Sequence, residues 1–288
     1  MLSLAVVAFV ISLLGTLGVM RLAQGRRSVY PKDAPQRFHK GNVPRLGSIG
    51  VLAGWAFALT SLPLLQVVGL GGHLRADRLS LLWLLLVLLP AYAAALVEDL
   101  TQQVAVRRRL LLTLASALLA WWLLGVSVPR LDFAWVDQIW TAWPWLGIGL
   151  ALLAVMGLPH AFNIIDGYNG LAGTMAIIVS LALAHVALQV GDRELAALAL
   201  TLAAATSGFL IWNYPLGLIF AGDAGAYLWG VLIAVISILL VQRHPVVSPW
   251  FPLLLLIYPV WETLFSIYRK LARGESPGMA AALHLHQD

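Results

Sequence analysis

The chain of 288 residues contains no cysteine, and charged residues make up only 11% of it. The absence of cysteine excludes disulfide bonds, thiolate metal sites and a cysteine nucleophile. A water-soluble domain has about 25% charged residues, whereas 61% of this chain is hydrophobic and its mean hydropathy is +0.88. We therefore expect an all-α protein embedded in a lipid bilayer. The net charge of +5 is too small an excess to favour binding of nucleic acid.

Nine stretches are apolar and long enough to cross a bilayer, which takes roughly 20 residues. They cover approximately 2–24, 46–70, 79–97, 110–127, 143–158, 171–190, 195–212, 225–242 and 250–268. These stretches predict a single polytopic domain over 1–288 with about nine transmembrane helices. No basic residue precedes the first stretch and Arg21, Arg26 and Arg27 follow it, so we interpret it as an uncleaved anchor.

Basic residues are distributed unevenly over the two sides that this topology creates. One side carries 13 of the 18 Lys and Arg residues, at 21–45, 107–109 and 269–273. Under the positive-inside rule this side is the cytoplasm, which places the N-terminus outside and the C-terminus inside. We interpret the tryptophans on the other side, at 135, 140, 143 and 145, as an aromatic belt at the membrane interface.

Polar residues, which are scarce in this chain, gather in five connections on the predicted cytoplasmic side. These connections are 25–45, 98–109, 159–170, 213–225 and 269–288. The side was assigned from basic residues alone, without reference to the motifs that the connections contain. The gathering of those motifs on one side therefore favours a single active site there.

Acidic residues at these membrane boundaries predict a metal site. Glu98 and Asp99 are adjacent, and neighbouring negative charges stabilise neither the C-terminus of a helix nor its apolar flank. Asp166 lies in the glycine-rich turn NIIDGYNG and Asp223 in GDAG. A helix N-cap by itself would explain Asp223, and a tight turn would explain the glycines. Together, Asp99, Asp166 and Asp223 offer the few carboxylates that Mg²⁺ takes beside substrate phosphates.

Several basic and acidic residues near these motifs admit simpler interpretations. The run Arg107–Arg109 could neutralise a diphosphate or an anionic lipid head group, but we interpret it as ordinary positive-inside charge. We leave Arg45 undecided between structure and anion binding. His284 and His286 lack the i, i+4 spacing of a zinc pair, so a polar tail explains them from spacing alone. Glu262 lies inside the last stretch, where a packing or supporting role is favoured over catalysis.

Taken in order, the five motifs resemble those of the polyprenyl-phosphate N-acetylhexosamine-1-phosphate transferases. The residues of the family pattern DxPxxRxxHxxxxPRxGG are matched by Asp33, Pro35, Arg37, His39, Pro44, Arg45 and Gly47. The Asp-Asp pair is matched by Glu98 and Asp99. NAxNxxDGxDGLxG is matched by HAFNIIDGYNGLAG, FMGDxGS by FAGDAGA, and RxxxGxSPFxPDxxHLHH by RKLARGESPGMAAALHLHQ. The chain departs from these patterns at Glu98, His160, Asn169, Ala226, 278–281 and Gln287.

This resemblance implies a membrane enzyme that moves a sugar 1-phosphate from a UDP-N-acetylhexosamine to undecaprenyl phosphate and releases UMP. The first expectation for the sugar is GlcNAc, and the reaction would initiate a cell-envelope glycan such as the O-antigen of lipopolysaccharide or a cell-wall polymer. The enzyme would lie in the bacterial inner membrane with its active site facing the cytoplasm, and a homodimer is a further expectation.

The resemblance also implies roles for individual residues. It implies Mg²⁺, with Mn²⁺ as an alternative, held by Asp223 and Asp99. It assigns catalysis to Glu98, Asp99 and Asp166. It assigns substrate binding to a set of basic and amide side chains, namely Arg37, His39, Arg45, Asn163, Asn169, His284 and His286.

Two other functions and one mechanistic choice remain open at this point. A transporter or flippase for a lipid-linked or anionic solute would place charges midway along its spans, whereas here only Glu262 among the acids does so. An inactive family relative would explain the substitutions at His160, Asn169 and Ala226. Within the enzyme reading, direct attack and a double displacement through an aspartyl phosphate are both open.

Overall fold

The computed structural model of the chain describes residues 1–23, 43–67 and 78–274, and it is helical throughout these parts. Its elements are α1 (Leu2–Ala23), α2 (Gly47–Thr60), α3 (Leu62–Val67), α4 (Arg78–Thr101), α5 (Val106–Leu124), α6 (Ala134–Ala142), α7 (Trp145–Ile165), α8 (Leu171–Gln189), α9 (Arg193–Asn213), α10 (Gly222–Arg243), α11 (Trp250–Leu255) and α12 (Ile257–Ala272). The expected all-α class is confirmed for the described residues.

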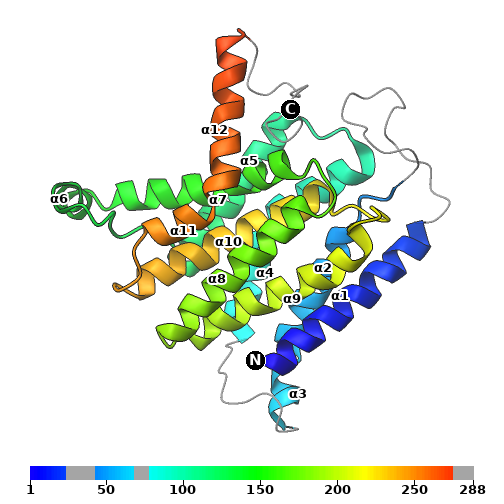
Figure 1. Cartoon of the computed structure of the whole chain (residues 1–288). Coiled ribbons are helices and arrows are strands. Elements are labelled where there is room, and N and C mark those ends of the chain that lie inside the picture. Colours follow the sequence, from blue (N-terminus) through cyan, green and yellow to red (C-terminus); the bar gives the residue numbers. More distant parts are fainter. Residues whose placement is uncertain (24–42, 68–77, 275–288) are drawn as a thin grey trace.

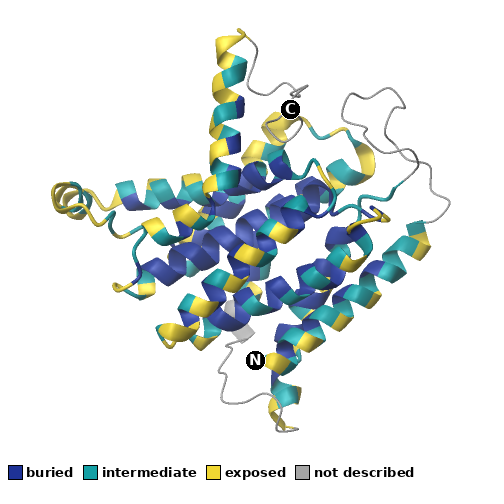
Figure 2. Cartoon of the chain, in the orientation of Figure 1, coloured by how far each residue is buried: buried dark blue, intermediate teal, exposed yellow. Residues whose placement is uncertain are grey.

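Helix α10 forms the centre of the bundle, with several long helices packed around it (Figure 1). Every residue from Gly222 to Val241 is buried, so α10 is dark along almost its whole length in Figure 2. Its sequence explains this position, because a helix that is apolar on all sides can be buried on all sides. The helices packed against α10 include α4, α7, α2, α8 and α9.

Neighbouring helices alternate in direction, so the ends of four helices meet the beginnings of four others. Helices α1, α4, α7 and α9 end where α2, α5, α8 and α10 begin. We call this the acidic end of the bundle, after Asp99, Asp166 and Asp223, which all lie there. The local reason is the same in each connection, since polar and glycine residues interrupt apolar runs that are otherwise continuous.

Six helices of the described residues are long and apolar enough to cross a membrane: Leu2–Ala23, Leu81–Thr101, Trp145–Ile165, Leu171–Gln189, Arg193–Asn213 and Gly222–Arg243. The other three predicted stretches take different forms. The stretch 46–70 is helical to Thr60 and again over Leu62–Val67, and 250–268 is divided into α11 and α12 at Leu256. Helix α5 begins at Val106 and so includes three arginines.

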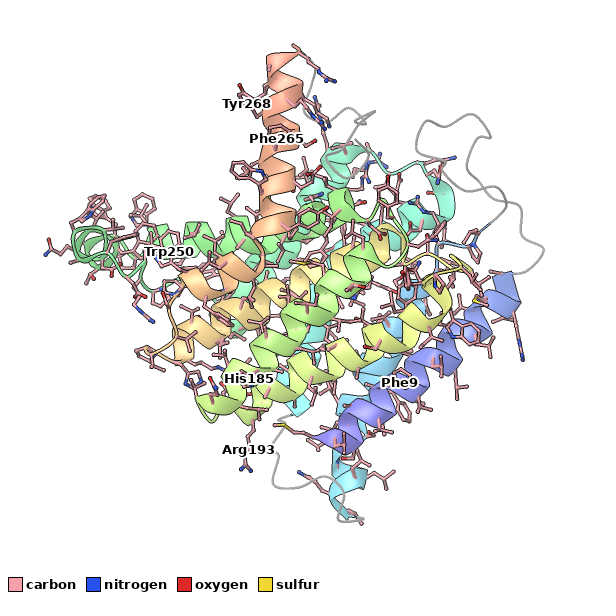
Figure 3. The ribbon with its side chains drawn as sticks, in the orientation of Figure 1. Phe9, His185, Arg193, Trp250, Phe265 and Tyr268 are labelled. Atoms are coloured by element: carbon pink, nitrogen blue, oxygen red, sulfur yellow. The ribbon has the colours of Figure 1, made fainter. Side chains whose placement is uncertain are left out.

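Helices α6 and α12 project from the bundle (Figure 1). Helix α12 packs against α7 through a narrow face, on which Pro259, Glu262 and Ser266 are buried. Phe265 and Tyr268 lie on the projecting half of α12 (Figure 3). They are far from His185 and Arg193, which lie near the connection between α8 and α9 (Figure 3). On α6 and the start of α7, Trp135, Trp143 and Trp145 are exposed, as side chains in an aromatic belt would be, and the belt stays a prediction.

Candidate active site at the acidic end

Asp99 joins α4 to the first turn of α10. Its Oδ1 accepts the backbone N–H of Asp223 and its Oδ2 accepts that of Ala224, both at 2.9 Å. The first N–H groups of a helix have no partner within the helix and favour a negative charge. Asp99 of α4 therefore caps the N-terminus of α10, a role that a side chain at the N-cap position of the same helix usually has. The simpler interpretation of Asp223 as an N-cap is wrong, because the N-cap position is Ala221 and no side chain there makes the bond.

Asp223 is left free of capping and pairs with Arg109 of α5. The Arg109 Nη1 lies 2.8 Å from the Asp223 Oδ2, and the two side chains are 20% and 12% exposed. This contact corrects the interpretation of Arg107–Arg109 as uniform surface charge, because Arg107 and Arg108 are exposed while Arg109 reaches across to α10. The sequence presents the three arginines alike and does not single out Arg109 as a site residue.

The segment around Arg45 lies directly beside the start of α10. Phe220 N–H donates to the Pro44 carbonyl at 2.9 Å, and Gly47 N–H donates to the Phe220 carbonyl at 2.9 Å. At Gly222, which has φ +75°, an added Cβ would collide with the Arg45 carbonyl and the Asp99 carboxylate. Only glycine allows the chain to pass this close to both groups at a positive φ.

Asp166 is the residue that follows α7, and it is partly buried. Removal from water raises the pKa of Asp166 to about 7, the Arg45 charge lowers it, and the negative charge of Asp223 raises it. Arg45 and Asp223 are therefore within electrostatic reach of Asp166, although they come from two other connections. The structure brings together Asp99, Asp166, Asp223 and Arg45, as the shared side of the connections predicted.

Glu98 and Asp99, which the sequence presents as a pair, point to different partners. The Glu98 Oε2 accepts the Val104 N–H at 2.8 Å and so closes the turn between α4 and α5. Successive residues on a helix project about 100° apart, which explains how one acid faces α10 and the next faces the turn. The observed contact of Glu98 is with the protein backbone.

Asn213, the last residue of α9, connects two of the site connections and was not singled out from the sequence. Its Oδ1 accepts the Gly170 N–H at 2.7 Å, and its Nδ2 donates to the Ile219 carbonyl at 2.9 Å. Asn169, predicted to bind substrate, donates from Nδ2 to the Pro215 carbonyl at 3.4 Å and so joins the same two connections, 159–170 and 213–225. In the sequence, Asn213 is only an amide before Tyr-Pro at the end of an apolar stretch, which does not identify its partners.

A chain of hydrogen bonds lies one helical turn farther from the acidic end than the Arg109–Asp223 pair. The His160 Nδ1 lies 3.0 Å from the Tyr227 hydroxyl, and its Nε2 lies 3.2 Å from the Thr113 hydroxyl. Thr113 donates its own proton to the backbone carbonyls of Arg109 and Leu110. A neutral His160 with its proton on Nε2 satisfies all of these contacts, since it donates to Thr113 and accepts from Tyr227.

The donor set of the site fits a hard divalent cation. Its acids are carboxylates, the ligand type that Mg²⁺ prefers, and the charge of Asp223 acts on Asp166 from across the site. No group of three or more His, Cys, Asp or Glu side chains suited to a metal occurs within 1–23, 43–67 and 78–274. That finding is compatible with Mg²⁺, because this ion usually keeps several waters and takes one or two carboxylates with substrate phosphates.

The remaining predicted site residues divide into two groups. Asn163 lies on the last turn of α7, three residues before Asp166. Arg37, His39, His284 and His286 lie outside the described residues, as do most of the connections 25–45 and 269–288.

Comparison with known proteins covers most of this chain. The model of glycosyl transferase family 4 matches residues 81–241, a range that contains Asp99, Asp166 and Asp223. A probable undecaprenyl-phosphate N-acetylglucosaminyl 1-phosphate transferase of Bacillus subtilis (strain 168) is 25% identical over 98% of this chain and 76% of its own length. A putative UDP-N-acetylglucosamine–dolichyl-phosphate N-acetylglucosaminephosphotransferase of Saccharolobus solfataricus is 32% identical over 81% of this chain and 69% of its own. The undecaprenyl-phosphate alpha-N-acetylglucosaminyl 1-phosphate transferase of Escherichia coli (strain K12) is 30% identical over 49% of this chain.

Proposed function

This chain belongs to glycosyl transferase family 4, and we propose that it transfers a sugar 1-phosphate from a UDP-N-acetylhexosamine to undecaprenyl phosphate. One observation carries the proposal. Three acids from separate connections, Asp99, Asp166 and Asp223, meet the basic residues Arg45 and Arg109 at one end of a membrane bundle. Such a mixed set of charges suits a reaction between two phosphate-bearing substrates, one of which is a lipid.

In the proposed reaction, an oxygen of the lipid phosphate attacks the β-phosphorus of the UDP-sugar. A new P–O bond forms there, the bond from the β-phosphorus to the bridging oxygen breaks, and UMP leaves with that oxygen. Phosphoryl transfer is accelerated mainly by alignment and by neutralisation of charge. Arg45 and Arg109 would supply positive charge to the phosphates, and Asp99 would hold the N-terminus of α10 in place for them.

The acids would divide between holding a cation and exchanging a proton. Asp223 and Asp99 would hold Mg²⁺, or Mn²⁺ in its place, and the cation would neutralise charge on the diphosphate. Asp166 has its pKa at about 7, near neutral pH, which suits exchange of a proton with the lipid phosphate. We retain Glu98 as a catalytic candidate, although the hydrogen bond that it accepts from the Val104 N–H supports a structural role.

The cellular setting follows from the same proposal. We place the acidic end at the cytoplasmic face of a bacterial inner membrane, with the N-terminus outside, because 13 of the 18 Lys and Arg residues lie on that side. GlcNAc is the first sugar to test, because three relatives carry N-acetylglucosaminyl or N-acetylglucosamine in their names. Assembly as a homodimer is a further part of the proposal that cross-linking in membranes can test.

The decisive experiment uses the full chain, purified in detergent or nanodiscs, with Mg²⁺, undecaprenyl phosphate and a panel of UDP-sugars. We expect UMP to be released in equal amount to a lipid-linked sugar diphosphate. Release of UDP would instead show ordinary glycosyl transfer, and release of neither nucleotide would favour a transporter or an inactive relative. A burst of UMP without lipid acceptor would replace direct attack by a double displacement.

A further inference from the structure

We propose that Arg109 exchanges partners during the reaction cycle. Its guanidinium pairs with Asp223 before substrates bind and turns to the phosphates of the UDP-sugar once they are present. The inference rests on the proposed function and names the residue of this chain that would bind the nucleotide diphosphate. It also explains why one arginine of an apparently uniform run is placed differently from the other two.

The first argument is selective placement. Arg107, Arg108 and Arg109 are consecutive, yet the first two are exposed and Arg109 is only 20% exposed in its side chain. Positive-inside charge needs no such difference, because exposed arginines near a membrane surface serve it equally well. Arg109 is therefore in the site for a reason other than orientation of the chain.

The second argument is that Asp223 does not satisfy the guanidinium. Arginine usually holds a carboxylate through two parallel N–H bonds, whereas the observed hydrogen bond to Asp223 Oδ2 comes from Nη1. The Arg109 Nε is buried and has no hydrogen-bond partner among the described residues. A buried donor without a partner is costly. A diphosphate has several acceptor oxygens, so it can accept hydrogen bonds from guanidinium N–H groups that the single Asp223 oxygen does not accept.

The third argument is that the bundle does not depend on the ion pair for its cohesion. One turn below it, the chain Tyr227–His160–Thr113 connects α10, α7 and α5. Thr113 lies four residues after Arg109, and Tyr227 lies four residues after Asp223, so this chain holds the same two helix turns. Arg109 can change partner while α5 and α10 stay in place.

The fourth argument links the exchange to the cation. Asp223 is the first choice for a ligand to Mg²⁺, and the oxygen that Arg109 occupies is one of its two carboxylate oxygens. Arg109 and a cation therefore compete for Asp223 before the nucleotide binds. Once the nucleotide is bound, both positive groups have phosphate oxygens to contact, and the competition ends.

The test measures two binding affinities of the full chain without lipid acceptor, so that no turnover occurs. The first is for Mn²⁺ alone, followed by electron paramagnetic resonance, and the second is for UDP-N-acetylglucosamine at saturating Mn²⁺, followed by calorimetry. We expect R109Q to bind Mn²⁺ about tenfold more tightly and the nucleotide about tenfold more weakly than wild type. The control R108Q removes the same charge from a neighbouring exposed position, and we expect both affinities to stay within about twofold.

Opposite shifts in the two affinities are the signature of exchange. Weaker or unchanged Mn²⁺ binding by R109Q would overturn the proposal, as would an unchanged nucleotide affinity. If R109Q does not fold, R109K serves in its place, because it keeps the charge but not the planar fork. R109K should bind the nucleotide more weakly than wild type, and unchanged binding would again overturn the proposal. Failure of wild type to release UMP from any UDP-sugar would instead overturn the proposed function.

Discussion

Asp99 and Asp223, separated by more than a hundred residues, are joined by a 2.9 Å hydrogen bond from the Asp223 backbone amide to the Asp99 carboxylate. Because Asp99 caps the first turn of α10, the Asp223 side chain is not needed for capping, and it pairs with Arg109 instead. This arrangement also explains why two acids can lie together at the end of a membrane helix. The amides of α10 stabilise the charge of Asp99, and Arg109 balances that of Asp223.

Asp223→Asn should abolish transfer and leave folding intact. The amide keeps the shape of the side chain but loses the charge that would hold Mg²⁺ and pair with Arg109. We expect a fall of at least about 100-fold in UMP release, as for the loss of one strong electrostatic group in an active site. The matched control is Glu194→Gln at the opposite end of the bundle, where Glu194 pairs with Arg243. Unchanged turnover by Asp223→Asn would remove Asp223 from the metal site.

Asp166→Asn should stabilise the substrate-free protein, and more at pH 8 than at pH 5. The pKa of Asp166 in the folded protein is about 7, above the ordinary 3.8 expected for an unfolded chain. Between these values the folded state binds the extra proton, so stability falls as the pH rises through this window. Thermal unfolding of wild type and variant at the two pH values measures the difference. Equal differences at both pH values would contradict the raised pKa.

Gly222→Ala should lower the yield of folded protein and its thermal stability. Gly222 has φ +75°, and an added Cβ would collide with the Arg45 carbonyl and the Asp99 carboxylate. We expect a loss of about 1–3 kcal/mol from the backbone strain alone. Gly149→Ala in α7 is the matched control, because no atom lies within 4 Å of a Cβ added there. Equal stability of the two variants would show that the close approach is not needed.

Asn213→Ala should destabilise the connections on both sides of the site and reduce transfer. The variant leaves the buried Gly170 N–H and Ile219 carbonyl without their partner, at about 1–3 kcal/mol each. Asn213→Asp keeps the acceptor for Gly170 but replaces the donor with a buried carboxylate oxygen that faces the Ile219 carbonyl, and it should be more harmful than Asn213→Ala. Asn169→Ala removes only a 3.4 Å contact to Pro215 and should be the mildest of the three. Any other order of melting temperatures would contradict this account of the two connections.

The general architecture was accessible from the sequence because it depends on local composition. Apolar runs of membrane length predict helices, and six of the predicted stretches correspond to described helices that can cross a membrane. The stretches 46–70 and 250–268 were predicted as single helices, whereas each is broken into two in the described parts. Such breaks depend on packing against neighbouring helices, and hydropathy summed over a window does not register packing.

The sequence by itself determined that this is a helical membrane protein, and it predicted that Asp99, Asp166 and Asp223 lie in connections on one side. That much follows from the cost of placing charge in hydrocarbon, which applies residue by residue. Only the tertiary structure decided which members of each motif face the site. Asp99 and Arg109 face α10 while Glu98 and Arg108 do not, because neighbours on a helix point in different directions and packing sets the rotation of the helix. Contacts such as Asn213 with Gly170, far apart in sequence, leave no local pattern to read.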